Sequence, residues 1–319
     1  MRLLLVGDSG SILSIELARA AAALIRRRDD VELVGVCDTA RGRSGRGRAA
    51  PELAAAVVKP LFGTPHPLRR AILLARGLPG PVIRPEGADP NAPEFLARLA
   101  RSVRPDAALW LGSVTLAGPP LLASLGRSVN YHNGTLPDLR GLHATAWSVH
   151  DASETSGFAF HVMDEGVDTG PVLVAGQVPV PPTATTAEVE QAKTAAAIAA
   201  LPALLDMLVR GEVGTPQRGA GSRHGSGDLR AAMVIGEAAA LTRDELERRL
   251  RAFGHLWITL PAGTLPVTAV RPSRSEGPLT FSTADGELLA AHRLRFLPPP
   301  LYRVAAGLRR ALRPRRARG

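Results

Sequence analysis

The sequence has one cysteine, Cys37, and only two lysines among its 319 residues. A lone cysteine excludes a disulfide framework and a cysteine-rich zinc site, and the histidines lack metal-ligand spacing. We therefore expect a cytoplasmic protein that binds no metal. Aromatic residues are scarce, at 4%, and no unbroken apolar run approaches the roughly 18 residues of a membrane helix, so we expect no membrane segment. An apolar fraction of 45% excludes a wholly disordered chain, and the length permits one large or two ordinary domains.

Positive charge is concentrated at the end of the chain. The net charge is +10, and residues 303–319 contain seven arginines and no acidic residue. This tail is either a solvated terminus or a docking arm for an acidic partner or nucleic acid. The charge alone therefore does not establish nucleic-acid binding.

Apolar runs alternate with Ala- and Leu-rich stretches along the first part of the chain. The expected strands are 2–6, 31–37, 81–84, 107–112 and 128–131, and the expected helices are 12–25, 94–103 and 119–125. Such alternation is typical of parallel βαβ units. It predicts an α/β fold with a doubly wound, mostly parallel sheet.

The pattern changes after Pro179. Thr185 and Glu188 form a capping-box pattern before an Ala-rich helix that should end near Gly211, and Pro202 should kink or divide this helix. Gly, Ser and Arg then predominate, as in a linker. A second capping box at Thr242 precedes a helix, and strands are expected at 257–260, 265–270, 279–282 and 288–296. We expect a domain at 1–211, a linker at 212–238, a small, mainly β, barrel-like domain at 239–302 and the basic tail at 303–319.

Polar side chains follow one of the expected parallel strands, where α/β sheets bind ligands. Asn130 and His132 lie two residues apart in a strand and should point to the same face. An amide and an imidazole so placed can both address one substrate oxygen, and Asp168 could orient the ring or accept a proton. A buried histidine held by an aspartate for structural reasons would give the same pattern.

A second candidate site is the turn that precedes the first expected helix. Its residues Ser9 and Gly10 could bind an anion such as a phosphate through backbone N–H groups. Asp8 would repel an anion, and the turn lacks both the dinucleotide-binding and the P-loop patterns. A simple tight turn between strand and helix is the alternative.

The segment 130–137, followed by Arg140-Gly141, resembles the Asn-x-His-x-Ser-Leu-Leu-Pro and Arg-Gly elements of the formyltransferases that use 10-formyltetrahydrofolate. The segment 157–170 matches that family's GxxxHxMDxGxDTG element nearly in full. The resemblance runs from about Met1 to Gly211, and it implies a Rossmann-like formyltransferase fold. More weakly, the region after Thr242 resembles the C-terminal β-barrel of the methionyl-tRNA enzymes.

The resemblance implies that 10-formyltetrahydrofolate is the co-substrate and that Asn130, His132 and Asp168 are catalytic. Asn130 and a protonated His132 would stabilise the oxyanion formed when an amine attacks the formyl carbon. Asp168 would keep His132 charged and pass a proton to the departing nitrogen. His161 matches a family position and either reaches the site or only packs. The residues implied to lie against the pterin are Trp110, Leu111, Gly112, Val114, Met163, Asp164, Glu165, Gly166 and Val167.

The sequence departs from the family where the acceptor would bind. Gly134 and Thr135 replace the usual Ser-Leu, and Leu142-His143 replaces the usual residues after Arg-Gly. Substrate contacts are expected from Ser9, Gly10, Arg140 and His143. The sequence of residues 130–147 most resembles formylation domains of nonribosomal peptide synthetases. We therefore expect a small or carrier-bound amine acceptor in specialised metabolism. The alternatives are methionyl-tRNA formylation and a non-catalytic module that binds folate or a partner; the sequence leaves the oligomeric state open.

Overall fold

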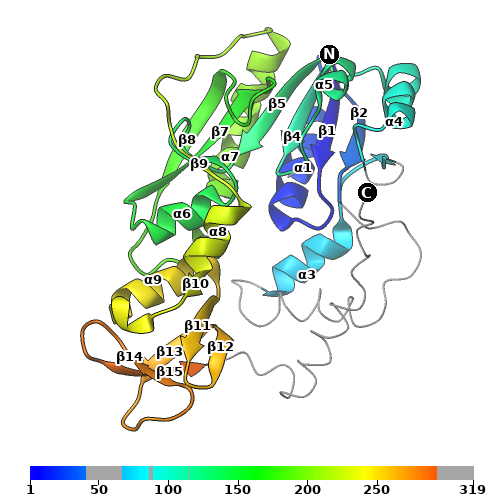
Figure 1. The fold of residues 1–319 in the computed structure, drawn as a ribbon. Coiled ribbons are helices and arrows are strands. Elements are labelled where there is room, and N and C mark those ends of the chain that lie inside the picture. The colour runs from blue at the N-terminus through cyan, green and yellow to red at the C-terminus, as the bar shows by residue number, and fades with distance from the viewer. Residues whose placement is uncertain (41–66, 86–88, 114, 293–319) are drawn as a thin grey trace, which may run out of the picture. The chain divides into compact units, whose positions relative to one another are not determined.

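The computed structural model describes residues 1–40, 67–85, 89–113 and 115–292 and divides the chain into two compact units, Met1–Ala231 and Ala232–Gly319 (Figure 1). The expected arginine-rich loop before residue 50, Val114 and the basic tail 303–319 lie outside the described residues.

The first unit contains a seven-stranded sheet with the order β3-β2-β1-β4-β5-β7-β8. Its strands are β1 (Arg2–Gly7), β2 (Glu32–Asp38), β3 (Val82–Ile83), β4 (Ala107–Leu111), β5 (Arg127–His132), β7 (Thr155–Val162) and β8 (Val172–Pro179). The first five are parallel, and β7 and β8 join antiparallel. The chain moves outward from β1 in one direction and continues at β4 in the other, so the switch point lies between these two strands.

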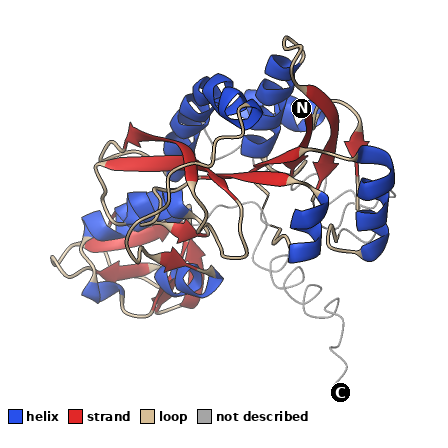
Figure 2. Ribbon diagram, turned by 90° about the horizontal axis from the view of Figure 1, so that it is seen from above, coloured by secondary structure: helices blue, strands red, loops and turns tan. Residues whose placement is uncertain are grey.

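Helices cover both sides of this sheet (Figure 2). They are α1 (Ile12–Ile25), α3 (Pro67–Arg76), α4 (Pro93–Arg98) with the π-helical turn η2 (Leu99–Val103), α5 (Pro119–Ser124), α6 (Ala144–His150) and α7 (Thr186–Val209). Side chains of β1 alternate between the two faces, because Leu3 and Leu5 join the core under α1 and α7, whereas Leu4 and Val6 join the core under α4 and α5. The mostly parallel doubly wound sheet is thus as predicted.

Helix α7 begins as predicted but is not divided at Pro202. Thr185 and Glu188 form the predicted capping box, but the helix runs without a break through Pro202. Among the described residues α7 is also the one helix that is long and apolar enough to cross a membrane by length and composition. This helix contains no long unbroken apolar run, because polar residues interrupt its Ala- and Leu-rich sequence. Leu201 and Leu205 are fully buried in the main core, which accounts for its apolar character within this unit.

Residues after α7, which we expected to form a linker, are bound to the first unit. Thr215 forms a bridge with Val172, and the short strands β6 (Arg140–Gly141) and β9 (Arg223–His224) pair in parallel. Helix α8 (Ser226–Met233) follows. Composition rich in Gly, Ser and Arg suggested a free connection, but the backbone hydrogen bonds hold this segment in place.

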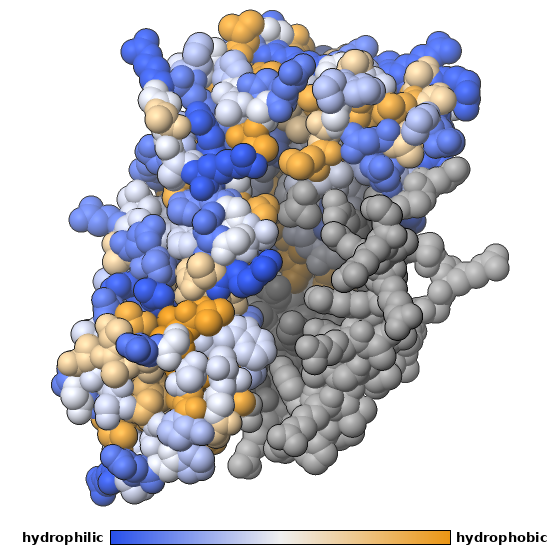
Figure 3. Space-filling view, viewed as in Figure 1, coloured by the Kyte–Doolittle hydropathy of each residue, from blue (hydrophilic) through white to orange (hydrophobic). Residues whose placement is uncertain are grey.

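The second unit is mainly β, as predicted. Its elements are β10 (Val234–Ile235), the 3-10 turn η3 (Ala238–Ala240), α9 (Arg243–Phe253), β11 (Leu256–Leu260), β12 (Gly263–Val267), β13 (Ala269–Pro272), β14 (Thr280–Ser282) and β15 (Leu288–His292). The described strands form two three-stranded sheets, β10-β11-β12 and β13-β15-β14, rather than one closed barrel. Leu246 and Leu289 are fully buried in their common core, and Figure 3 shows apolar residues gathered on the visible face of this unit.

Candidate active site

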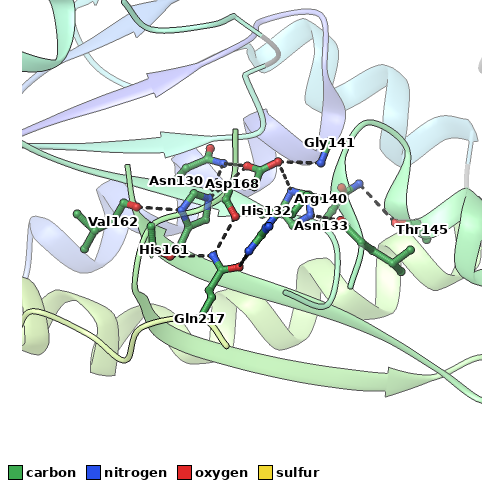
Figure 4. Close-up of polar contacts among 12 residues, drawn as sticks. Asn130, His132, Asn133, Arg140, Gly141, Thr145, His161, Val162, Asp168 and Gln217 are labelled. Carbon is green, nitrogen blue, oxygen red and sulfur yellow. Dashed lines mark hydrogen bonds and ion pairs between the residues drawn. The ribbon is translucent and has the colours of Figure 1, made fainter. Parts of the chain in front are cut away.

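Strand β5 positions Asn130 and His132 at the carboxyl end of the parallel part of the sheet. Asn130 lies opposite Trp110 of β4 on one side and opposite His161 of β7 on the other. Asn130 and His132 both contact Asp168, which comes from the loop after β7 (Figure 4). The structure therefore brings together the three side chains singled out from the sequence.

The carboxylate of Asp168 lies at the centre of this cluster. Its Oδ1 accepts a hydrogen bond from Asn130 Nδ2 at 3.3 Å, and its Oδ2 lies 3.4 Å from His132 Nδ1 and accepts from the Gly141 backbone at 2.9 Å. The Asp168 backbone is left-handed, with φ 55°, a conformation that costs energy for a residue with a Cβ. Burial raises the pKa of Asp168, but the contacts with His161, His132 and Gly141 outweigh it, so the pKa is lowered and the carboxylate is charged.

His132 is 5% exposed, and this burial is the main reason that its pKa is lowered below 6.5. Asp168 and the Leu139 carbonyl oppose the shift, whereas His161 and Lys193 add to it. We expected Asp168 to keep His132 protonated. The Asp168 carboxylate does raise the pKa of the ring, but burial lowers it more, which favours the neutral ring in the free protein.

His161 joins the same cluster. Its Nε2 lies 3.3 Å from Asp168 Oδ1 and 3.2 Å from Asn130 Nδ2, and its Nδ1 contacts the Val162 carbonyl at 3.0 Å. Because that carbonyl can only accept, Nδ1 carries a proton and Nε2 faces the amide and the carboxylate. His161 therefore reaches the site, and it is one of two imidazoles that share Asp168.

The loop after β5 wraps closely around the His132 ring. Nε2 of His132 lies 2.5 Å from the Leu139 carbonyl oxygen. A Cβ at Gly134 would lie 2.5 Å from the same oxygen and 2.6 Å from His132 Nε2. In this chain the imidazole and the loop carbonyl thus occupy the space that a side chain at position 134 would need.

Lys193 of α7 is fully buried beneath this loop, and sequence reasoning missed it. Its ammonium group donates to the Asn133 carbonyl at 2.5 Å and to the Gly157 carbonyl at 3.2 Å. Burial lowers the pKa of Lys193 to about 7, against a smaller opposing effect of Glu190. Lysine in an Ala-rich helix gave no sequence signal, because its partners are backbone atoms distant in the chain.

The structure shows the surroundings of two residues that are expected to contact the acceptor. The guanidinium group of Arg140 is bound to the Gln217 side chain at 2.8 Å and to the Ala220 carbonyl at 3.1 Å. His143 is exposed at the start of α6, with a left-handed backbone of φ 62°. Gln217 itself had no signal in a segment that we interpreted as a linker.

The turn containing Ser9 and Gly10 does not offer the anion site considered from the sequence. The Ser9 N–H donates to the Asp38 carboxylate at 3.0 Å, and the Gly10 N–H donates to the Asp8 carboxylate at 2.6 Å. Asp8 of the turn and Asp38 at the end of β2 therefore occupy the donors that a phosphate would need, and their charge would repel it. This turn is a strand-to-helix connection.

The residues expected near the pterin fall into two groups. Trp110 and Leu111 have buried side chains in the cores on opposite faces of the sheet, so these two residues can offer a ligand only their backbone. The second group, Met163, Asp164, Glu165, Gly166 and Val167, forms a loop that is largely exposed.

Asp164 folds that loop by accepting hydrogen bonds from the Gly166 backbone at 3.1 Å and from the Thr169 hydroxyl at 2.6 Å. Within the described chain, the N–H groups of Glu165 and Val167 make no hydrogen bond. A heterocycle bearing alternating donors and acceptors fits such backbone. Among the described residues, no group of three or more His, Cys, Asp and Glu side chains is arranged to hold a metal ion.

Comparison with known proteins shows which family the chain matches. The family model described as formyl transferase matches residues 21–205, which is more than half of the chain. Methionyl-tRNA formyltransferase of Myxococcus xanthus is 28% identical over 230 residues, covering 70% of this chain and 64% of that protein. GDP-perosamine N-formyltransferase of Brucella melitensis is 34% identical over 95 residues, covering 30% of this chain and 37% of that protein. The chain thus spans less than two thirds of either relative.

Solved structures share the fold at low sequence identity. A sugar N-formyltransferase from a Shewanella species has a TM-score of 0.60 and 16% identity, and the match covers 84% of this chain and 97% of that one. HypX from Aquifex aeolicus, solved with tetrahydrofolic acid, has a TM-score of 0.58 and 14% identity over 91% of this chain and 43% of that one.

Proposed function

Since the chain belongs to the formyl transferase family, we propose that it moves a formyl group from 10-formyltetrahydrofolate to an amine, in the cytoplasm and without a metal. The observation that carries this proposal is the convergence of Asn130, His132 and Asp168 at the end of β5. An amide, an imidazole and a charged carboxylate supply a hydrogen-bond donor, a proton acceptor and a group that stabilises the protonated ring.

The neutral state of His132 decides how we assign the proton transfers. Nδ1 of the ring, the nitrogen without a proton, takes the proton that the attacking amine loses as the new C–N bond forms, and it then gives that proton to the folate nitrogen as the old C–N bond breaks. While His132 is charged, Asp168 pairs with it at Nδ1. No proton is gained or lost over the cycle, so a neutral ring in the resting protein is the form that can begin it.

Asn130 is assigned to the formyl oxygen. Its amide nitrogen makes two long contacts in the free protein, at 3.3 Å with Asp168 and 3.2 Å with His161. Contacts of this length are readily exchanged for a substrate oxygen on which negative charge develops, and catalytic hydrogen bonds are often long before the substrate binds. The exposed loop 163–167 and the backbone end of β4 at Gly112 would hold the folate, which supplies the formyl group.

For the acceptor we propose a small or carrier-bound amine of specialised metabolism, such as an amino acid, a hydroxyornithine-like amine, an amino sugar or a carrier-tethered aminoacyl group. Support comes from the departures at Gly134 and His143, where the family's other acceptors would bind, and from relatives named as sugar N-formyltransferases. The carboxylates of Asp8 and Asp38 around the Ser9 turn disfavour an acceptor phosphate at that position.

Methionyl-tRNA formylation is the second candidate. The alignment with the Myxococcus xanthus enzyme covers 70% of this chain, and the second unit is mainly β, as expected of the tRNA enzymes' extension. Strong dependence of activity on salt would favour this acceptor, because tRNA binding neutralises phosphates.

The test is to incubate the protein with 10-formyltetrahydrofolate and a panel containing each amine class and methionyl-tRNA. Mass spectrometry then detects the added formyl group, and Asp168→Asn serves as the matched inactive control. Transfer to one class identifies the acceptor. Folate binding without transfer to any amine would instead support the non-catalytic module.

A further inference from the structure

We infer that Gln217 is a positioning residue that fixes the carboxylate of Asp168 relative to His132, and this inference rests on the proposed function. Gln217 lies in the segment after α7 and bonds to the chain on both sides of the Asp168 carboxylate (Figure 4). It contacts neither Asn130 nor His132 within the described residues, so it acts through Asp168 and Arg140.

The amide nitrogen of Gln217 holds the Asp168 backbone. Nε2 donates to the Asp168 carbonyl at 2.9 Å and to the Gly170 carbonyl at 2.8 Å, so both of its protons are used. These carbonyls belong to the turn in which Asp168 adopts its left-handed conformation, φ 55°. A residue with a Cβ keeps that conformation only where its surroundings hold it, and Gln217 supplies two of the bonds that do so.

The amide oxygen of Gln217 holds the opposite side of the carboxylate. Oε1 accepts from Arg140 at 2.8 Å and 3.3 Å, through two nitrogens of the guanidinium group. The next residue, Gly141, donates its N–H to Asp168 Oδ2 at 2.9 Å. One primary amide thus holds both the Asp168 backbone and the Arg140-Gly141 segment that binds the Asp168 carboxylate. Among side chains, only those of Asn and Gln combine two N–H donors with an acceptor oxygen in this way.

The path of the segment does not depend on this side chain. Thr215 and Val172 exchange two backbone hydrogen bonds of 2.8 Å, the Arg140 N–H donates to the Ser222 carbonyl at 3.1 Å, and the Leu142 N–H donates to the His224 carbonyl at 2.8 Å. Substitution of Gln217 should therefore leave the segment in place and change only the support of Asp168. This separates a positioning role from a role in folding.

Two substitutions of Gln217 test the contributions of its hydrogen bonds. Gln217→Glu keeps an acceptor for Arg140 but turns an oxygen toward the Asp168 and Gly170 carbonyls, which is repulsive. Gln217→Met keeps a similar length without any of the polar bonds. Gln177→Glu is the matched control, because Gln177 is an exposed glutamine of β8 whose Oε1 accepts a hydrogen bond from Thr155.

The experiment measures formyl transfer, thermal unfolding and the NMR titration of His132 in all three variants. We expect Gln217→Met and Gln217→Glu to lower kcat by about 10- to 100-fold, the range that a small misplacement of a catalytic group produces. KM for the amine should stay near that of the wild type, thermal unfolding should change little, and the His132 titration should shift, with Gln177→Glu unchanged throughout.

Unchanged kcat and an unchanged His132 titration in Gln217→Met would overturn the positioning role. A loss of kcat that follows a loss of folded protein would overturn it as well, since it would assign Gln217 to folding. Should the wild type transfer no formyl group to any amine, the proposed function fails, and the His132 titration still decides whether Gln217 positions Asp168.

Discussion

Nε2 of His132 lies 2.5 Å from the Leu139 carbonyl oxygen, while Nδ1 of the same ring faces Asp168 Oδ2 at 3.4 Å. A carbonyl oxygen only accepts hydrogen bonds, so the proton of the neutral ring resides on Nε2 and the lone pair of Nδ1 points toward the carboxylate. A proton that arrives at Nδ1 would form an ion pair with Asp168. This geometry supports the proposal that His132 receives a proton during the reaction.

The first prediction concerns the pH at which His132 titrates. Because burial lowers its pKa, we expect the ring to remain neutral until the pH falls below 6.5. The unfolded chain binds the proton more readily, so the free energy of unfolding should fall as the pH drops through that region. NMR titration of labelled histidines, assigned with His132→Gln, measures this. A His132 pKa at or above 6.5 would contradict the prediction, and only a pKa well above 7 would restore the protonated ring.

A second prediction tests the catalytic assignments. Asn130→Ala and Asp168→Asn should each lower the rate of formyl transfer by about 10²- to 10³-fold, because each removes a group that stabilises charge developed in the reaction. Both variants should remain folded, since neither residue belongs to the hydrophobic cores. Single-turnover rates and circular dichroism measure the two effects. Near-normal transfer by either variant would refute the role assigned to that residue.

The third prediction is that Gly134 cannot carry a side chain. In Gly134→Ser the Cβ would lie 2.5 Å from the Leu139 oxygen and 2.6 Å from the His132 ring, so loop and ring must shift. We expect a loss of about 1–3 kcal/mol of stability, as overpacking produces, together with a loss of formyl transfer. The control is Gly227→Ala, because a Cβ at Gly227 in α8 would meet nothing within 4 Å. A Gly134→Ser protein as stable and active as Gly227→Ala would contradict the steric argument.

Much of the fold follows from local sequence patterns. The helix at Ile12–Ile25 has the bounds predicted from its Ala- and Leu-rich sequence, and Asn130 and His132 lie in one strand, so their contacts with a common partner follow from the two-residue period. The protonation state of His132 could not be predicted from these local patterns. It depends on how deeply the ring is buried, which is a property of the assembled fold.

Other parts of the site depend on contacts between backbone groups distant in the sequence. Gln217 lies in a Gly- and Ser-rich stretch whose partners are carbonyls about fifty residues earlier. The turn at Ser9 looked open to an anion because Asp38, which accepts its N–H, belongs to the next strand. Such contacts become visible only when β1 and β2 are placed side by side.

The last prediction concerns Lys193, whose pKa burial lowers from 10.5 to about 7. Between these two values the unfolded chain holds a proton that the folded chain has released, so the free energy of unfolding should rise with pH by up to about 1.4 kcal/mol per pH unit. The neutral amine keeps two N–H groups, which suffice for the Asn133 and Gly157 carbonyls.

Lys193→Met removes the titrating group, so the rise in stability between pH 7 and 10.5 should disappear. Urea unfolding at several pH values measures the slope, and its comparison with the wild type cancels the contributions of all other groups. Lys193→Met also leaves the Asn133 carbonyl without its partner, which should loosen the loop beside His132 and lower formyl transfer. Equal slopes in the two proteins would show that Lys193 stays charged when buried, and the lysine would then hold the loop as an ammonium ion at every pH tested.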